Sequence, residues 1–252
     1  MTLGKYIAGG EKNTAYEAIS KMMNGYDVGV SYADMMRLRI SGGAAQECYD
    51  VYYVAHDKGR PLSRHWMGYG RHEGAVGNWG NFLTAPEERG KGYGGSLLKF
   101  WYDDFKNTEN KPSCFLCTGG ALSLAQLYSR FGFRPAIRGR EFGPLYMPVG
   151  DSPDSFLEFT ENYYKPSPVL FHRPATIGYR HEIDCLLRFY FVDSGLEFGI
   201  GGASYVEEGL LYYPERVGML FTEVGRCVGW SLDGELQTHP LYKKSDIIDQ
   251  RV

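Results

Sequence analysis

A run of glycine and cationic residues stands out in the first half of the chain. Six of the seven residues from Arg89 to Gly95 are glycine, lysine or arginine. Glycines between a strand and a helix let backbone N–H groups approach an anion closely, and the start of the helix adds a partial positive charge. Arg89 and Lys91 add two full charges. The segment is therefore predicted to bind a diphosphate, and a tight structural turn is the alternative.

Two common nucleotide-binding motifs fit this turn poorly. Gly90, Gly92 and Gly95 satisfy the spacing G-x-G-x-x-G, but that motif needs glycines directly after a strand and an acid at the end of the next strand. Here the segment Pro86–Arg89 intervenes, and the next predicted strand, Ser113 to Thr118, contains no acid. No Gly-Lys pair is followed by Ser or Thr, which excludes the nucleoside triphosphate loop.

The turn is expected to join a strand to a helix. Residues Asn78 to Ala85 have the pattern of a strand that ends at Pro86, and apolar residues recur at helical spacing after Gly92. These apolar residues are Leu97, Leu98, Trp101 and Phe105. A further strand, Ser113 to Thr118, precedes a second helix that Gly132 would cap. One face of that helix carries Leu124, Tyr128 and Phe131.

The stretch from Phe82 to Gly94 resembles motif A of the GNAT superfamily of acyl-CoA-dependent N-acyltransferases. The motif reads Arg/Gln-x-x-Gly-x-Gly/Ala after a strand and a Pro-containing turn. Further along, Leu127 to Phe133 is similar to the family's L-Y-x-x-x-G-F element. The resemblance covers roughly Thr14 to Pro148 and implies an α/β (α+β) fold with a GNAT-like mixed central sheet flanked by helices. It also implies acetyl-CoA, or another short acyl-CoA, as co-substrate and no metal.

The resemblance implies roles for individual residues. Backbone N–H groups from Phe82 to Thr84 would hold the pantetheine arm and polarise the thioester carbonyl, which gains charge during acyl transfer. Tyr128 would be the general acid that protonates the departing thiolate, and a buried structural tyrosine is the alternative. The residues expected to bind CoA are Phe82, Leu83, Thr84, Arg89, Gly90, Lys91, Gly92, Tyr93, Gly94, Gly95 and Ser123.

Two positions depart from the family's pattern. Ala121 stands where many members have Asn, so one cofactor contact is expected to be either absent or supplied by Ser123. Asn78 stands where some members have a glutamate base. His72 and Glu73, near the start of the same strand, are the candidate bases and would act through water; the alternative for each is an ordinary surface residue.

The other elements are less distinctive. Thr14 is predicted to begin a helix with a capping box, a second helix starts at Ser31, and Glu47–Ala55 and Trp66–Val76 form a hairpin. After Gly150 no family resemblance is found. There, the residues from Asp151 to Pro153 predict a helix start, and those from His181 to Phe191 fit either a buried helix or a strand. Two strands are expected at Val217–Thr222 and Cys227–Leu232.

These patterns divide the chain into a GNAT-like acyl-CoA-binding domain, residues 1–150, and a C-terminal α+β extension, residues 151–252. The extension would be either a cap on the acceptor side or an oligomer surface, with a homodimer in the second case. No segment of the sequence contains the roughly 18 consecutive apolar residues of a membrane helix, so a cytoplasmic protein without a membrane partner is expected.

Composition narrows the function classes. The net charge is -3 and cationic residues are scattered, so nucleic acid is not an expected partner. The five cysteines are an odd number and are expected to be reduced; Cys114 and Cys117 would point to opposite faces of a strand. The function that the GNAT resemblance implies is that of an N-acyltransferase, most simply an acetyltransferase, that acts on a small-molecule or peptide amine. A non-catalytic acyl-CoA sensor or scaffold and a nucleotide-modifying enzyme on the same fold are the alternatives.

Overall fold

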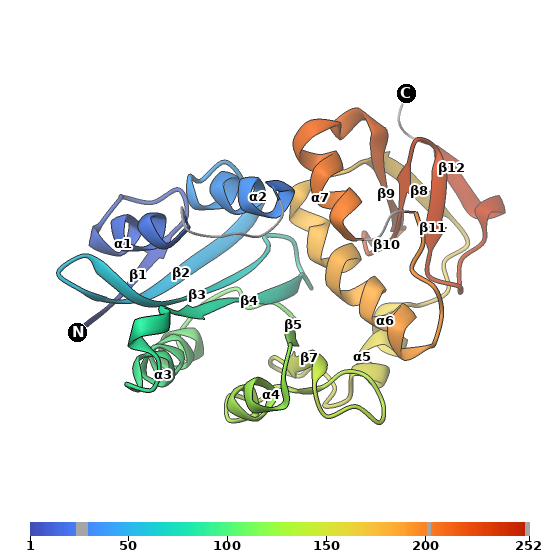
Figure 1. Ribbon diagram of the computed structural model, residues 1–252. Coiled ribbons are helices and arrows are strands. Elements are labelled where there is room, and N and C mark those ends of the chain that lie inside the picture. Colours follow the sequence, from blue (N-terminus) through green and yellow to red (C-terminus); the bar gives the residue numbers. More distant parts are fainter. Residues whose placement is uncertain (24–29, 201–202, 250–252) are drawn as a thin grey trace.

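The computed structural model describes residues 1–23, 30–200 and 203–249, and it contains two sheets (Figure 1). The first sheet has seven strands in the order β1-β2-β3-β4-β5-β7-β6. They are β1 (Thr2–Ile7), β2 (Cys48–Asp57), β3 (Arg60–Gly70), β4 (Val76–Thr84), β5 (Cys114–Gly119), β6 (Arg134–Pro135) and β7 (Gly143–Pro148). Strands β4 and β5 are parallel and the other neighbours are antiparallel. The sheet is therefore mixed, as predicted.

Helices cover both faces of this sheet (Figure 1). α1 (Thr14–Met23) and α2 (Val30–Ile40) lie on one face, and α3 (Tyr93–Lys106) and α4 (Leu122–Ser129) lie on the other. The cap of α1 is one residue earlier than predicted, because Oδ1 of Asn13 accepts a hydrogen bond from the backbone N–H of Tyr16. The apolar residues predicted to share one side of α3 are all buried.

Strands β2 and β3 form the predicted hairpin, but with a tighter turn. Lys58 and Gly59 both have positive φ, 46° and 80°, which is the two-residue turn that matches the twist of paired strands. The hairpin strand β3 ends at Gly70, and Val76 already belongs to β4.

The second sheet has five strands in the order β11-β10-β9-β8-β12. They are β8 (Leu170–Pro174), β9 (Val217–Thr222), β10 (Cys227–Leu232), β11 (Glu235–Thr238) and β12 (Ile247–Asp249). The helices of this part are α5 (Phe156–Tyr163), α6 (Arg188–Asp193) and α7 (Ala203–Tyr212). A π-helical turn, Glu182–Leu187, leads directly into α6.

Some elements of this second region agree with the sequence predictions and others differ. Strands β9 and β10 have the predicted bounds. The segment from His181 to Phe191 is helical rather than extended. Helix α5 begins later than predicted, because Ser155 is its cap and accepts a hydrogen bond from the backbone N–H of Glu158. Among the described residues, no helix has the length and apolar character to cross a membrane.

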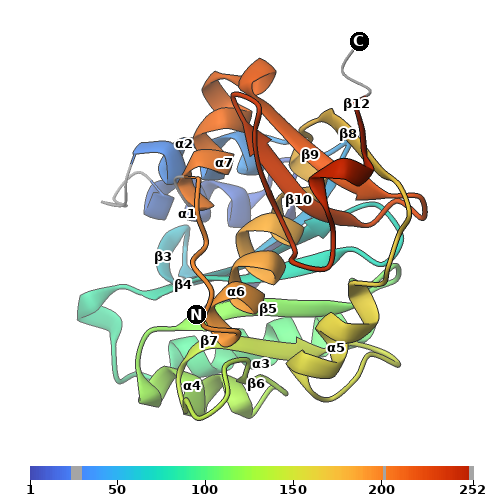
Figure 2. The same ribbon diagram turned by 90° about the vertical axis from the view of Figure 1, so that its right-hand side faces the viewer.

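One hydrophobic core joins the two parts of the chain. Val76, Cys114, Leu116 and Tyr146 of the first sheet are each 0% exposed and pack in a cluster with Leu186, Phe189 and Trp230 of the C-terminal part. On the opposite face of β5, Phe115 and Cys117 pack with α3 and α4. Cys114 and Cys117 therefore face opposite ways, as predicted. Figure 2 looks onto the C-terminal part and shows α6 next to β5.

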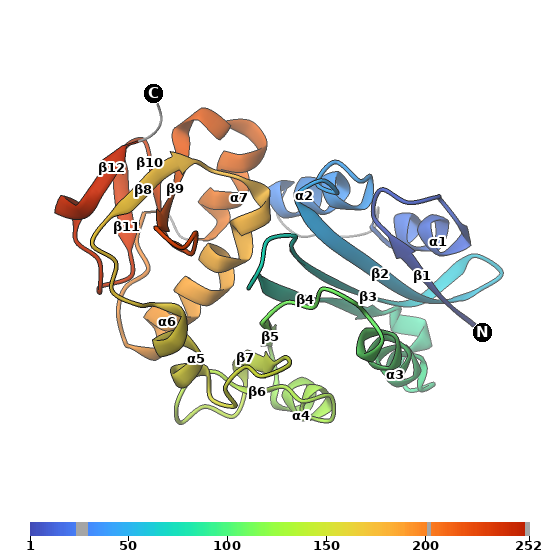
Figure 3. The same ribbon diagram turned by 180° about the vertical axis from the view of Figure 1, so that it is seen from behind.

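The seam between the two parts, where Figure 3 shows α2 next to α7, also contains buried polar side chains. Glu182 is 0% exposed, and its Oε1 accepts a hydrogen bond from the backbone N–H of Val76 at 3.0 Å and lies 2.9 Å from Nε2 of His72. Arg39 and Asp50 form a wholly buried ion pair.

The backbones of the two parts come very close at a pair of glycines. A Cβ atom at Gly70 would overlap the carbonyl oxygen of Gly178, and one at Gly178 would lie 3.3 Å from the carbonyl oxygen of Glu47. Any larger residue at Gly70 would therefore push the two parts away from each other.

Candidate functional site

The predicted glycine turn lies between β4 and α3. A short 3-10 turn, Pro86–Glu88, follows β4, and α3 begins at Tyr93 with Gly92 as its cap residue. Gly90 and Gly92 have φ values of 78° and 81°, in the left-handed region that favours glycine. No side chain of the described residues caps this helix start. The first N–H groups of α3 lack partners within the helix, so the start of α3 suits an anion.

The glycines of the turn serve two purposes. A Cβ atom at Gly90, Gly92 or Gly95 would meet no atom within 4 Å, so the backbone borders open space at these positions. A Cβ atom at Gly94 would instead lie 2.7 Å from the ring of Phe82. Gly94 thus allows α3 to pack closely on β4, while the other three positions have the room that the predicted diphosphate contact requires.

A buried carboxylate organises the cations around the turn. Glu88 is 5% exposed; its Oε1 accepts a hydrogen bond from Nη1 of Arg60 at 2.6 Å, and its Oε2 accepts one from Nζ of Lys91 at 2.8 Å. The bonds from Lys91 and Arg60 hold the pKa of the Glu88 carboxyl below its usual value. Nε of Arg89 donates to the carbonyl oxygen of Thr84 at 3.3 Å.

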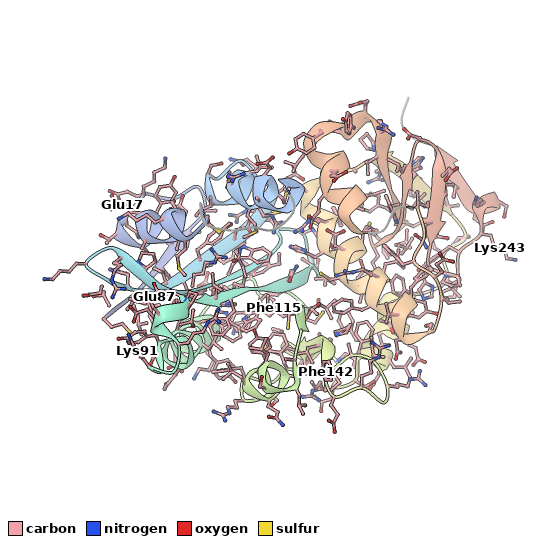
Figure 4. The ribbon with its side chains drawn as sticks, in the orientation of Figure 1. Glu17, Glu87, Lys91, Phe115, Phe142 and Lys243 are labelled. Carbon is pink, nitrogen blue, oxygen red and sulfur yellow. The ribbon has the colours of Figure 1, made fainter. Side chains whose placement is uncertain are left out.

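This arrangement adds a residue that the sequence patterns did not indicate. Arg60 comes from the β2–β3 hairpin and reaches the turn only because the chain folds back, so no local motif marks it. Figure 4 shows Glu87 and Lys91 at the end of the molecule that lies away from the C-terminal part. The cationic turn is therefore far from the seam.

Beside the turn, β4 has an edge that no strand covers. The register between β3 and β4 shifts between Gly80 and Leu83, and Asn81 in this bulge has a φ of 52°. In the described chain, β5 pairs with β4 only from Val76 to Asn78. The two strands then diverge. Residues 79–84, the open edge of β4, are left without a neighbouring strand on the β5 side.

Helix α4 places Tyr128 beside this open edge. Its side chain is 5% exposed, and its ring centroid lies 4.6 Å from that of Trp79 and 6.2 Å from that of Phe82. The structure thus brings Tyr128, the open edge and the glycine turn to one region. Ser123 is exposed in the first turn of α4, which begins after Ala121 without a side-chain cap from the described residues.

The two candidate bases lie elsewhere. His72 and Glu73 precede β4, whereas the glycine turn follows it; the nine residues of β4, at about 3.3 Å each, separate the two ends by roughly 25–30 Å. The ring of His72 stacks on Tyr179 of the C-terminal part with 3.8 Å between centroids, and Glu73 is exposed. Both line a cavity of about 850 Å³ between the two parts. The structure therefore does not place them with Tyr128 and the turn.

Residues 49–135 match the family model described as an acetyltransferase (GNAT) domain. This segment is a GNAT domain. It runs from β2 to β6 and includes the glycine turn, the open edge of β4 and Tyr128. The match ends before the C-terminal part, so the second sheet lies outside the GNAT model.

Solved structures of GNAT proteins are also similar to this chain. A GNAT family N-acetyltransferase (YhbS) from Escherichia coli in complex with CoA is 16% identical, with 59% of this chain and 82% of that chain covered and a TM-score of 0.41. ElaA from Escherichia coli is 12% identical, with 60% of this chain and 100% of that chain covered and a TM-score of 0.44. A GNAT family acetyltransferase from Brucella melitensis in complex with acetyl-CoA is 16% identical, with 60% of this chain and 92% of that chain covered and a TM-score of 0.40. No curated protein matches the chain.

Proposed function

We propose that this protein is an acyl-CoA-dependent N-acyltransferase. The observation that carries the proposal is that an uncapped helix start with a glycine turn lies directly beside the open edge of β4 within the GNAT domain. CoA has two chemically different parts that match these two features. Its diphosphate is an anion, and its pantetheine arm is an extended chain with two amide groups.

The diphosphate would bind at the start of α3, where backbone N–H groups and the helix dipole favour negative charge. The pantetheine arm would then continue along the open edge of β4, because an extended ligand with amide groups can pair with a free strand edge as an added strand does. Backbone groups from Phe82 to Thr84 would take part in that pairing. The thioester would then lie near Tyr128.

The reaction is direct transfer to an amine. The neutral nitrogen attacks the thioester carbonyl, a C–N bond forms, the C–S bond breaks, and the nitrogen loses a proton to water. The hydroxyl of Tyr128 would protonate the departing thiolate as general acid. The acceptor would be a small-molecule or peptide amine.

The C-terminal part would form a cap on the acceptor side. It packs on the face of β4, β5 and β7 that is opposite α3 and α4, through the cluster that contains Val76, Leu116 and Tyr146. CoA would occupy the side of the sheet that carries the glycine turn and α4. The acceptor would then reach the thioester from the opposite face, which the C-terminal part borders.

CoA and acetyl-CoA are expected to raise the melting temperature of the protein, whereas NAD is not. A ligand that binds only the native state, at one hundred times its Kd, stabilises it by about 2.7 kcal/mol. In a chain of this size that corresponds to a shift of roughly 5–10 °C. The measurement is a thermal melt with each compound. A shift with NAD and none with CoA would favour a dinucleotide site instead.

The substitution Gly95→Ala is expected to weaken CoA binding about tenfold or more without loss of stability. The added methyl group would occupy the open space above the first turn of α3, where the diphosphate would lie. Replacing glycine in a helix by alanine adds up to about 1 kcal/mol of stability. Calorimetric titration with CoA and a thermal melt measure the two effects.

The matched control for this variant is Gly199→Ala in the C-terminal part, where the nearest neighbour of a Cβ atom is 3.8 Å away. Equal CoA affinity in Gly95→Ala and in the unmodified protein would mean that the turn has only a structural role. Gly92→Val and Gly94→Val are poorer tests, because Gly92 has positive φ and a side chain at Gly94 collides with Phe82.

A further inference from the structure

The inner end of the open edge is closed by an indole ring. Strands β4 and β5 meet at Asn78 and Leu116, and Trp79 is the first residue of β4 beyond that point. Its side chain is 1% exposed and belongs to the core between the sheet and the helices α3 and α4. The place where the two strands come together is therefore also the place where the Trp79 indole lies.

Four rings from four segments hold this indole in position. Their centroids lie 4.3–5.2 Å from that of Trp79. They belong to His65 of β3, Trp101 of α3, Tyr128 of α4 and Phe133 before β6. Because protein interiors are close-packed, an indole fixed on several sides cannot move aside without displacing these neighbours.

Beyond one of these rings there is unused space. Phe133 also lines a cavity of about 300 Å³ that Leu122, Ala125 and Leu145 border. Trp79 packs on Phe133, and Phe133 borders this cavity. A smaller residue at position 133 would let the indole move towards the cavity, and a smaller residue at position 79 would open the inner end of the edge directly.

We propose that Trp79 limits the acyl group of the co-substrate to a short chain of about two or three carbon atoms. The inference rests on the proposed function, which directs the pantetheine arm from the turn towards Asn78 and places the thioester near Tyr128. A longer acyl chain would have to continue past the thioester into the space that the indole fills. The structure thus favours acetyl-CoA over medium-chain acyl-CoA.

The test is to titrate the full-length protein with CoA, acetyl-CoA and hexanoyl-CoA in a calorimeter, so that no acceptor needs to be known. Acetyl-CoA is expected to bind at least about tenfold more tightly than hexanoyl-CoA, since mismatched methylene groups in such pockets discriminate by about 10–200-fold. In Trp79→Leu, and independently in Phe133→Leu, the ratio of the two affinities is expected to fall to within about threefold. Trp230→Leu, an equal truncation of a 0% exposed tryptophan in the second sheet, should keep the ratio of the unmodified protein.

The outcomes separate this inference from the function on which it rests. If the unmodified protein binds hexanoyl-CoA as tightly as acetyl-CoA, Trp79 sets no limit, although the proposed function stands. The inference is equally wrong if the affinity ratio survives in folded Trp79→Leu and Phe133→Leu. If Trp79→Leu does not melt cooperatively, the inference is still tested by Phe133→Leu and by the affinities of the unmodified protein for acetyl-CoA and hexanoyl-CoA. Failure to bind any of the three compounds would overturn the proposed function itself.

Discussion

Residues 1–150, expressed without the rest of the chain, are expected to give no soluble, cooperatively folded protein. The first sheet would lose the cluster that covers one face of its central strands. Val76, Leu116 and Tyr146 are 0% exposed in the full chain and pack against the C-terminal part. Burying one such side chain stabilises a fold by about 1.5–3 kcal/mol. Three of them therefore contribute an amount comparable to the whole net stability of a domain, about 5–15 kcal/mol.

Polar contacts at the seam add to this loss. Without residues 151–252, the backbone N–H of Val76 would lose its bond to Glu182, and the buried Arg39–Asp50 ion pair would lose the ring of His181, whose Nε2 lies 3.2 Å from Nη1 of Arg39. Circular dichroism melts and light scattering of the two proteins are the measurements.

The matched control is co-expression of 1–150 with 151–252 as separate chains. It keeps every side chain and removes only the peptide bond after Gly150. Recovery of soluble complex would assign the failure to the missing contacts. If residues 1–150 alone melted cooperatively and near the temperature of the full chain, the two parts would be independent domains.

Tyr128→Phe is expected to lower the rate of acyl transfer by about 10²–10⁴-fold, the range typical of general acid catalysis. The change keeps the ring that packs on Trp79 and Phe82 and removes only the hydroxyl. A CoA thiolate is a fairly stable leaving group near neutral pH, so the lower end of the range is expected. Affinity for CoA should change little, because the loss would fall on the chemical step. Release of free thiol with a panel of primary amines measures the rate.

Tyr102→Phe is the control for this variant, because Tyr102 on α3 packs on Phe131 in the same core. Transfer at the unmodified rate by Tyr128→Phe, when chemistry limits turnover, would make Tyr128 a packing residue. If the unmodified protein and the variant both bind acyl-CoA but transfer nothing to any amine tested, a sensor or scaffold becomes the better assignment.

Local patterns in the sequence predicted the region around the turn because every signal there is local. The glycines, the proline before them and the helical repeat from Leu97 to Phe105 belong to one continuous stretch, and strand, turn and helix follow from it. The contact of Arg60 with Glu88 could not be predicted in this way. It joins a hairpin turn to the glycine turn, and polar residues in turns carry no signal of a distant partner.

The C-terminal part was harder to predict for a different reason. From His181 to Leu187 every residue is buried, so hydrophobic residues do not alternate with polar ones at either the helical or the strand period. The positions of His72 and Glu73 illustrate a second limit. They precede the strand that leads to the turn, but an extended strand carries its two ends far apart, and closeness in sequence does not indicate closeness in space.

The glycine pair at the seam has a consequence for how this chain can vary. At Gly70 the fit between the two parts depends on a hydrogen atom where other residues carry carbon, because a Cβ atom there would overlap the carbonyl oxygen of Gly178. At Gly178 a Cβ atom would lie 3.3 Å from the carbonyl oxygen of Glu47, a tight but less severe contact. A new C-terminal part grafted onto the first sheet could bring its backbone this close only because residue 70 has no side chain. Gly70 has no side chain, yet it restricts which C-terminal part can pack on the first sheet.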